Sequence, residues 1–444
     1  MSNEPFQLAE TLCHYVKRSG CTVSQLARLT DVPHPTLVNW LEGRVKKPRY
    51  WDALLRVAAV LNLNEEEATT LLQSAGHPSI EELLLSSNGE QDKSLLAPWS
   101  KLVIKRQQSP FQAIADLPYF VGREAHLRAV KETILNEHPA PIYSLQGMAG
   151  AGKTALAARI AYALRFHFSD GVLWTRVDHS DTMSILSAFA AAYDQDLSQY
   201  SDIASRSQVV RTLLAHKRAL IVLDNVLHSE EIRPLIPPTG SCAVIVTTRR
   251  HDLALSRGTH RLIIEPFDKD KQESMLLFEQ LLGEKQLQRD RPLLAEIADL
   301  VGHLPLAVAI VGGRLAYECD WSANQFLRRL RQGKKRLKEL VYEDQSVALS
   351  FHLSYQTLTS EQRRFFAALS TLTSEDFSVE AATHVAQQPK ERVFDALRRL
   401  YNLSLVQSGR RQRHYRLHPL LRDYAYAQLQ FAQRSARIYR PNGV

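Results

Sequence analysis

The chain has 444 residues, a formal net charge of +8, 45% apolar residues and 23% charged residues. That length suggests roughly two to four domains, because a single core rarely grows beyond about 250–300 residues. We expect a cytoplasmic protein with no membrane partner, since no apolar run approaches the ~18 residues of a membrane span and no secretory signal is recognisable. The scattered cysteines indicate reduced thiols and no zinc site; they are Cys13, Cys21, Cys242 and Cys319.

Residues 1–76 have the periodicity of short amphipathic helices. Ser24 to Leu29, a turn at Asp31–Pro33 and a helix from about His34 to Leu41 predict a helix–turn–helix. The region resembles the phage-repressor-like helix-turn-helix family. That resemblance implies that the second helix reads base edges in the major groove of duplex DNA while a following basic cluster grips phosphates.

The candidate DNA-binding residues lie on the second helix and in the basic cluster, and they are His34, Thr36, Asn39, Arg44, Lys46 and Lys47. Asn39 could pair with adenine, and Thr36 could contact a base edge or a thymine methyl group. The alternative is a helical adaptor that recruits a protein. Glu65 to Glu67 would repel DNA if they lay on the same face as the basic cluster.

Residues 77–117 lack sustained periodicity and contain spaced prolines, which predicts a linker. From 118 to 267, strand-like apolar runs alternate with helical patterns. The runs begin at Ile142, Val172, Ala219, Ala243 and Leu262. Such alternation predicts an α/β domain with a parallel sheet covered by helices on both faces.

The segment from Gly147 to Thr154 fits G-x-x-x-x-G-K-[ST] and lies between a predicted strand and a predicted helix. In such a P-loop the backbone N–H groups and the helix N-terminus face phosphates. We expect Lys153 to bridge the β- and γ-phosphates and the Thr154 hydroxyl to ligate Mg²⁺. The expected phosphate-binding residues are Gly147, Gly150, Gly152, Lys153, Thr154 and the adjacent Ala155.

The strand from Ala219 ends in Asp224, which we expect to organise the metal together with Thr154. The next residue is Asn225, where many P-loop relatives place a second acid. Because an amide cannot accept a proton from the attacking water, this position indicates slow hydrolysis and a weak ATPase at most.

A series of short motifs follows in order along residues 118–430. They are Phe120-Val121-Gly122-Arg123-Glu124, the P-loop, Leu223-Asp224-Asn225, Val246-Thr247-Thr248-Arg249, Gly302-His303-Leu304-Pro305-Leu306 and Leu417-His418-Pro419-Leu420. The set resembles the NB-ARC family, the STAND-type switch ATPases of plant disease-resistance proteins, animal apoptosome activators and many bacterial regulators. The chain departs from the commonest family pattern at Asn225 and Pro419-Leu420, which bears on hydrolysis and on the closed state.

The resemblance implies roles for further residues. Val121 and Arg123 match the motif that lies beside the adenine, and Pro305 matches the proline that packs on it. Arg249 matches the sensor arginine that reads the γ-phosphate, so Lys153, Asp224 and Arg249 are the catalytic candidates. His418 matches the winged-helix histidine that touches the β-phosphate of ADP in the closed state.

The sequence thus predicts a multidomain protein with an all-α head (1–76), a linker (77–117), a nucleotide-binding domain (118–267), a helical subdomain (268–345), a winged helix (346–430) and a tail (431–444). We expect an ADP- or ATP-dependent switch that regulates transcription through duplex DNA and associates with itself when ATP is bound. A sensor or effector could be a separate protein.

The alternative is an oligomerising scaffold of the defence type, whose head recruits a protein effector. An ordinary ATPase with fast turnover is disfavoured by Asn225.

Overall fold

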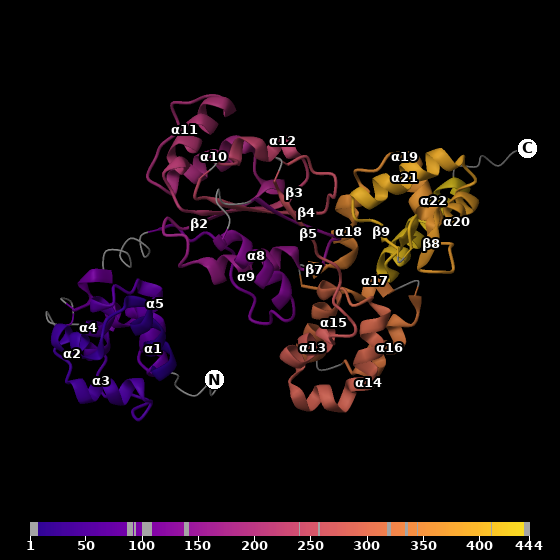
Figure 1. The fold of residues 1–444 in the computed structure, drawn as a ribbon. Coiled ribbons are helices and arrows are strands. Elements are labelled where there is room, and N and C mark those ends of the chain that lie inside the picture. The colour runs from indigo at the N-terminus through magenta and orange to yellow at the C-terminus, as the bar shows by residue number, and fades with distance from the viewer. Residues whose placement is uncertain are drawn as a thin grey trace, which may run out of the picture. The chain divides into compact units, whose positions relative to one another are not determined.

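The computed structural model describes residues 8–86, 92, 95–99, 109–136, 142–238, 240–255, 258–317, 321–333, 336–343, 345–409 and 411–438. The chain forms two compact units, Met1–Ser109 and Pro110–Val444, which we call the head and, after the family that its sequence motifs resemble, the ATPase unit (Figure 1). Among the described residues, no helix is both long and apolar enough to span a bilayer.

The head is all-helical. Its helices are α1 (Leu8–Ser19), α2 (Val23–Thr30), α3 (His34–Leu41), α4 (Asp52–Val60), α5 (Glu65–Ser74) and α6 (Ile80–Ser86). Helix α2 begins with a capping box in which Thr22 accepts from the backbone of Gln25, and it ends at Asp31 in the left-handed conformation. Leu26, Leu37 and Trp40 are buried, so the predicted helix–turn–helix packs around a shared core.

The segment expected as a linker contributes to both units. Ile80, Leu83 and Trp99 are buried in the head, and the Trp99 indole donates a 3.0 Å hydrogen bond to the Leu63 carbonyl. Helix α6 has only seven residues, which is too short for sustained periodicity to reveal it. Beyond the head core, residues 110–112 pair with the sheet of the ATPase unit.

The ATPase unit contains a five-stranded parallel sheet in the order β2-β3-β4-β1-β5, which confirms the predicted α/β fold. The strands are β1 (Ile142–Gln146), β2 (Val172–Arg176), β3 (Leu220–Val226), β4 (Ala243–Thr248) and β5 (His260–Ile263). Strand β5 begins two residues earlier than its apolar run suggests, because its side chains alternate in burial and only half of them are apolar.

Alternate residues of the central strands build two separate cores. Val222 and Ile245 pack with α8 (Glu124–Asn136) and α9 (Lys153–Leu164) on one face. Ile221 and Val244 pack with α10 (Thr182–Ala191) and α11 (Ile203–Ala215) on the other. Figure 1 shows α8 and α9 on one side of the sheet and α10, α11 and α12 (Ser229–Ile232) on the opposite side. Burial on both faces explains why these strands read as unbroken apolar runs.

The rest of the unit is mostly helical. It comprises α13 (Glu273–Leu282), α14 (Glu284–Leu300), α15 (Pro305–Tyr317), α16 (Ala323–Leu330), α17 (Arg336–Glu339), the pair β6 (Val341–Tyr342) and β7 (Gln345–Ser346), α18 (Val347–Tyr355), α19 (Ser360–Leu369), β8 (Asp376–Ser378), α20 (Val379–Ala386), α21 (Lys390–Asn402), β9 (Gln407–Ser408), β10 (His414–Arg416) and α22 (Pro419–Ile438). Strands β8, β10 and β9 form an antiparallel sheet in which β10 pairs with both of the others.

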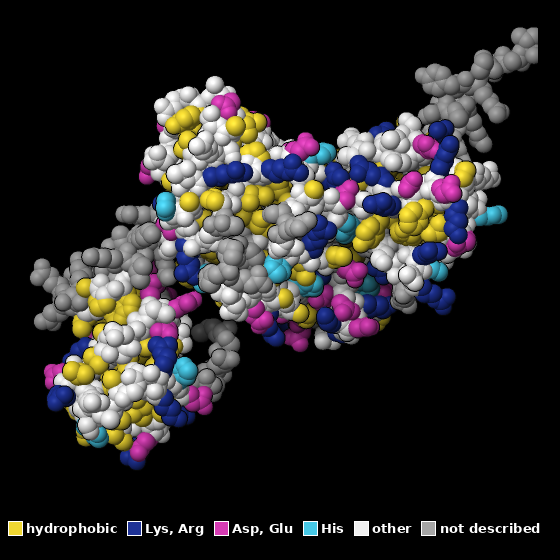
Figure 2. Space-filling model, turned by 45° about the horizontal axis from the view of Figure 1, so that its top comes forward, with side chains coloured by type: hydrophobic (Ala, Val, Ile, Leu, Met, Phe, Trp, Pro, Cys, Tyr) yellow, Lys and Arg dark blue, Asp and Glu magenta, His cyan; other side chains and the backbone are white. Residues whose placement is uncertain are grey.

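Charge is mixed on the face of the ATPase unit that Figure 2 draws. On the face drawn in Figure 2, Lys and Arg side chains are interspersed with acidic and apolar ones. The net charge of +8 therefore forms no single basic field on that face.

Residues just before the nucleotide-binding region extend the edge of the sheet at β2. Val172 donates a 2.8 Å hydrogen bond to the Pro110 carbonyl, and Gln112 donates a 2.9 Å bond to the Val172 carbonyl. Between them, the Phe111 ring lies edge-on to Tyr162 of α9. This approach requires Gly171, whose φ is +100° and whose added Cβ would lie 2.2 Å from the Pro110 carbonyl oxygen.

We expect Gly171→Ala to lower the free energy of unfolding of the ATPase unit by about 2–4 kcal/mol, combining backbone strain with a forced shift of Pro110. Gly258→Ala is the matched control, because Gly258 also has positive φ but has nothing within 4 Å of the added Cβ. Denaturant titration of both variants measures the difference, and equal losses would show that the Pro110 contact contributes no stability.

Candidate nucleotide-binding site

The P-loop joins β1 to α9, as the sequence predicts. Gly147 follows Gln146 directly, and helix α9 begins at Lys153. The turn brings the backbone so close to Ile264, the residue after β5, that a Cβ on Gly147 would lie 2.3 Å from the Ile264 carbonyl oxygen. Gly150 and Gly152 also have positive φ, so the loop can curl with its N–H groups toward a phosphate.

Lys153 is buried against the loop that it follows. Its Nζ donates hydrogen bonds of 2.8 Å and 2.9 Å to the carbonyls of Gly147 and Met148. Burial lowers the pKa of the ammonium group to about 7; the positive charge of Arg249 adds to this, and Asp224 opposes it. The negative charge of a bound phosphate would raise this pKa again and keep the amino group protonated.

Thr154 and Asp224 lie side by side. The Thr154 hydroxyl donates a 2.8 Å hydrogen bond to Asp224 Oδ1, which also accepts from the Thr247 hydroxyl of β4. Among the described residues no group of three His, Cys, Asp or Glu side chains could hold a metal by itself. One hydroxyl and one carboxylate match what Mg²⁺ takes from protein when phosphate oxygens complete its shell.

Arg249 extends from the end of β4 to helix α18. Its guanidinium donates a 2.9 Å hydrogen bond to the Ser350 carbonyl. Burial lowers the pKa of Arg249, while Asp178 and Asp224 favour its charged form. The predicted sensor residue thus lies within electrostatic reach of Lys153 and Asp224, but its hydrogen bond goes to a carbonyl in the C-terminal region.

The residues expected beside the adenine lie around the P-loop. Arg123 is buried; it donates to the carbonyls of Glu265 and, at 3.4 Å, of Ala151. Val121 is half-buried against the main core. Pro305 begins α15, where the next backbone N–H, that of Leu306, donates a 3.1 Å hydrogen bond to Gly150.

His418 is buried against the turn before α15. Its Nε2 lies 2.9 Å from the Gly302 carbonyl, while its Nδ1 accepts a 3.2 Å hydrogen bond from the Leu420 N–H. Since a carbonyl can only accept, these contacts define a neutral ring with its proton on Nε2. Burial lowers the pKa of His418 to about 4, which agrees with that neutral state.

Sequence reasoning missed a second histidine. His251 lies 3.3 Å from the Gln146 amide and 3.1 Å from the Ser404 hydroxyl, and its ring stacks on Tyr401. Its position two residues after Arg249 is the only sequence signal that could have drawn attention to it. The residue links the strand that leads into the P-loop with the end of α21.

The candidate DNA-binding residues belong to the head. His34 is exposed on α3, whereas Thr36 and Asn39 are half-buried. Arg44, Lys46 and Lys47 are exposed in the turn after α3, and Arg44 pairs with Glu42 at 2.6 Å. The structure thus gathers the predicted DNA-binding residues on one helix and the turn that follows it.

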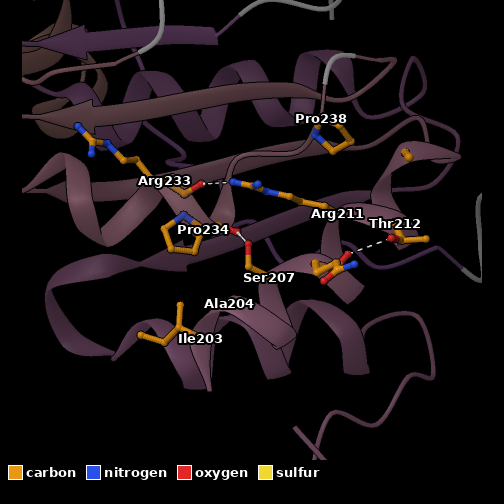
Figure 3. A pocket seen from close by; sticks show the side chains of 10 residues that line it. Ile203, Ala204, Ser207, Arg211, Thr212, Arg233, Pro234 and Pro238 are labelled. Atoms are coloured by element: carbon orange, nitrogen blue, oxygen red, sulfur yellow. Dashed lines mark hydrogen bonds between the residues drawn. The ribbon is translucent and has the colours of Figure 1, made fainter. Parts of the chain in front are cut away.

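A groove of about 860 Å³ lies away from the P-loop, between α11 and the 3₁₀ helix η2 (Arg233–Leu235). Figure 3 shows Arg211 and Ser207 on its wall, each donating to a backbone carbonyl, those of Arg233 and Pro234. None of the predicted nucleotide-binding residues lines this groove.

Comparisons with known proteins agree with this geometry. A family model described as "NB-ARC domain" matches residues 123–288. The regulatory protein AfsR of Streptomyces coelicolor is 30% identical over 331 residues, covering 72% of this chain and 33% of that protein. AfsR of Streptomyces griseus is 28% identical, covering 95% of this chain and 44% of that protein.

A solved structure of a Walker-type ATPase of Pyrococcus abyssi is 11% identical, with a TM-score of 0.48, covering 71% of this chain and 99% of that one. The chain spans less than half the length of the two AfsR relatives. The family match begins at Arg123 and includes the whole P-loop with Asp224 and Arg249. The chain therefore contains an NB-ARC domain, and this domain binds a nucleotide.

Proposed function

We propose that the chain is a regulatory switch controlled by ADP and ATP, with Mg²⁺ held by Thr154 and Asp224. The observation that carries the proposal is direct contact between the region after α21 and the nucleotide site. The Ser404 hydroxyl donates a 2.6 Å hydrogen bond to the Arg249 carbonyl, and the Gln407 amide lies 3.4 Å from the sulfur of Met148 in the P-loop. A change at the phosphates can therefore reach the winged-helix region through these contacts.

Arg249 is the residue that we propose to distinguish ATP from ADP. Its guanidinium is partly buried and bound to the Ser350 carbonyl, a neutral acceptor. A γ-phosphate carries negative charge and would compete for this cation, because a charge-assisted hydrogen bond is stronger than one to a neutral carbonyl. ATP would thereby loosen the attachment of α18, whereas ADP would leave it in place. Mg²⁺, when bound, neutralises phosphate charge.

We propose that the head binds the partner through which the switch acts. Exposed basic residues after α3 suit the phosphates of duplex DNA, and this supports a regulator that binds DNA. The alternative is a scaffold whose head recruits a protein, and exposed Leu29 and Tyr50, at 58% and 62%, favour that alternative. Self-association in the ATP state, cytoplasmic location and a separate sensor protein belong to the same proposal.

Nucleotide affinity is expected to fall as pH rises above 7. Binding requires the Lys153 ammonium, and in the nucleotide-free protein its pKa of about 7 means that the proton is lost above that pH. The loss of affinity approaches tenfold per pH unit, about 1.4 kcal/mol, and isothermal titration with ADP from pH 7 to 9 measures it.

Lys153→Arg is the matched control for this titration, because a guanidinium does not lose its proton in this range. We expect weaker binding by this variant with no pH dependence, and almost no binding by Lys153→Ala. An affinity for ADP that stays constant from pH 7 to 9 in the wild type would contradict the prediction.

His418→Ala should weaken the binding of ADP more than the binding of ATP, because we propose that the histidine stabilises the closed, ADP-bound state. A coupling of about 1–3 kcal/mol is typical of such switches.

Lower pH should also weaken the binding of ADP more than that of ATP. Burial in the folded protein depresses the pKa of His418 from its ordinary 6.5 to about 4. The stabilisation that the neutral ring gives is therefore present above pH 6.5 and is lost as pH falls toward 4. At pH 5 the loss is about 2 kcal/mol.

His418→Gln keeps a neutral donor and acceptor but cannot titrate, so its preference for ADP should not respond to the same pH change. Competition between labelled ADP and ATP at pH 7 and pH 5 compares the three proteins. If His418→Ala weakens both nucleotides equally, the histidine is structural and does not sense the nucleotide.

The full chain should bind duplex DNA with an affinity that falls steeply with salt. If Arg44, Lys46, Lys47 and Arg49 each meet a phosphate, the log–log salt slope should be roughly −3 to −4. Lys46→Ala with Lys47→Ala should flatten this slope, whereas Asn39→Ala should relax base preference and leave the slope nearly unchanged. Gel-shift titrations with ATP or ADP measure both effects, and the adaptor alternative predicts neither of them.

A further inference from the structure

A carboxylate from the turn that follows the neighbouring strand β2 lies beside Asn225, where the sequence lacks an acid. The Asn225 side-chain nitrogen donates a 2.6 Å hydrogen bond to Asp178 Oδ2. Asp178 belongs to the 3₁₀ helix η1 (Val177–His179), which follows β2 directly. In the sheet register Arg176 pairs with Asp224, so Asp178 lies at the carboxyl edge of the strands, where α/β folds bind their ligands.

We propose that Asp178 accepts the proton from the water that attacks the γ-phosphate, while Asn225 holds that carboxylate in place. The inference rests on the proposed function, because it requires ATP at the P-loop. The acid that is missing on β3 is replaced by an acid in η1, directly after β2. Under this proposal, a chain with an amide at position 225 would still have a general base for ATP hydrolysis.

The local backbone holds the pair in position. Asn225 adopts a left-handed conformation with φ of 58°, and its N–H donates a 2.9 Å hydrogen bond to the Thr247 hydroxyl. The same hydroxyl donates to Asp224, so the Asn225 backbone is tied to the proposed metal ligand. Such a strained conformation persists only where surrounding contacts fix it, and here those contacts belong to the nucleotide site.

Charge supports the same assignment. Asp178 is an exposed residue, but its side chain is only 14% exposed, because it lies 3.3 Å from Arg176 and 3.6 Å from His179. Burial lowers the pKa of Arg249, and the negative charge of Asp178 is the largest influence that opposes this. Asp178 and Asp224 thus both lie within electrostatic range of the arginine that we propose to contact the γ-phosphate.

The proposed step balances without any further reactant. The water oxygen forms a bond to the γ-phosphorus as the bond from phosphorus to the β–γ bridging oxygen breaks, and that electron pair leaves with ADP. The water proton passes to the Asp178 carboxylate and from there to solvent. Asn225 donates its amide hydrogen to Asp178, so its Oδ1 remains available to accept the other hydrogen of the water.

Asp178→Asn is the direct test, because it removes the charge and keeps a side chain that can bond to Asn225. Single-turnover hydrolysis of radiolabelled ATP should fall ~100-fold or more, the usual contribution of a general base. ATP affinity, measured on the same protein, should change by no more than about twofold, since the step is confined to the transition state. His179→Ala is the control, which removes a neighbour of Asp178 and should leave the rate within about twofold.

The exchange variant Asp178→Asn with Asn225→Asp moves the carboxylate to β3 and keeps a carboxylate–amide pair. We expect it to recover most of the lost hydrolysis, which a purely structural role for Asp178 would not predict. The proposal is overturned if Asp178→Asn hydrolyses ATP like the wild type, or if it loses ATP binding in proportion to hydrolysis. A wild type that binds no ATP would instead refute the proposed function.

Discussion

The buried amino group of Lys153 is the constraint around which the nucleotide site is arranged. A cation removed from water needs acceptors, and it takes the carbonyls of Gly147 and Met148 while Asp224 supplies the nearest opposing charge. The positive charge of Arg249 raises the free-energy cost of keeping Lys153 protonated. A phosphate bound here would satisfy both cations, which is why nucleotide binding can reorganise contacts well beyond the P-loop.

Those further contacts depend on groups that remain neutral. His418 links α22 to the turn before α15, and His251 links the end of α21 to β1. Burial lowers the pKa of both rings, so at neutral pH they act as hydrogen-bonding groups without charge. The segment that contains α21 and α22 is thereby attached to the P-loop region without adding positive charge to a site that already holds Lys153 and Arg249.

The sequence predicted what local chemistry dictates. The P-loop, the strand that ends in Asp224 and the helix–turn–helix each depend on neighbouring residues, so the fold class could be inferred and is confirmed. Trp99 could not be placed in the head, nor Phe111 at the edge of the sheet, because both contacts join distant segments. His251 and Asp178 were missed for the same reason, since their roles depend on which strands and helices become neighbours.

On the proposed function, the pairing of Asn225 with Asp178 would connect slow ATP hydrolysis to switching. A base held through an amide on the adjacent strand depends on two segments, β2 and β3, keeping their relative position. Both acids also act on Arg249, and Arg249 is bound to α18. Displacement of α18 would therefore alter the electrostatic environment in which the proton is transferred. Hydrolysis and release of the winged-helix region are on this view coupled through one arginine, so the lifetime of the ATP state depends on the same contacts that respond to it.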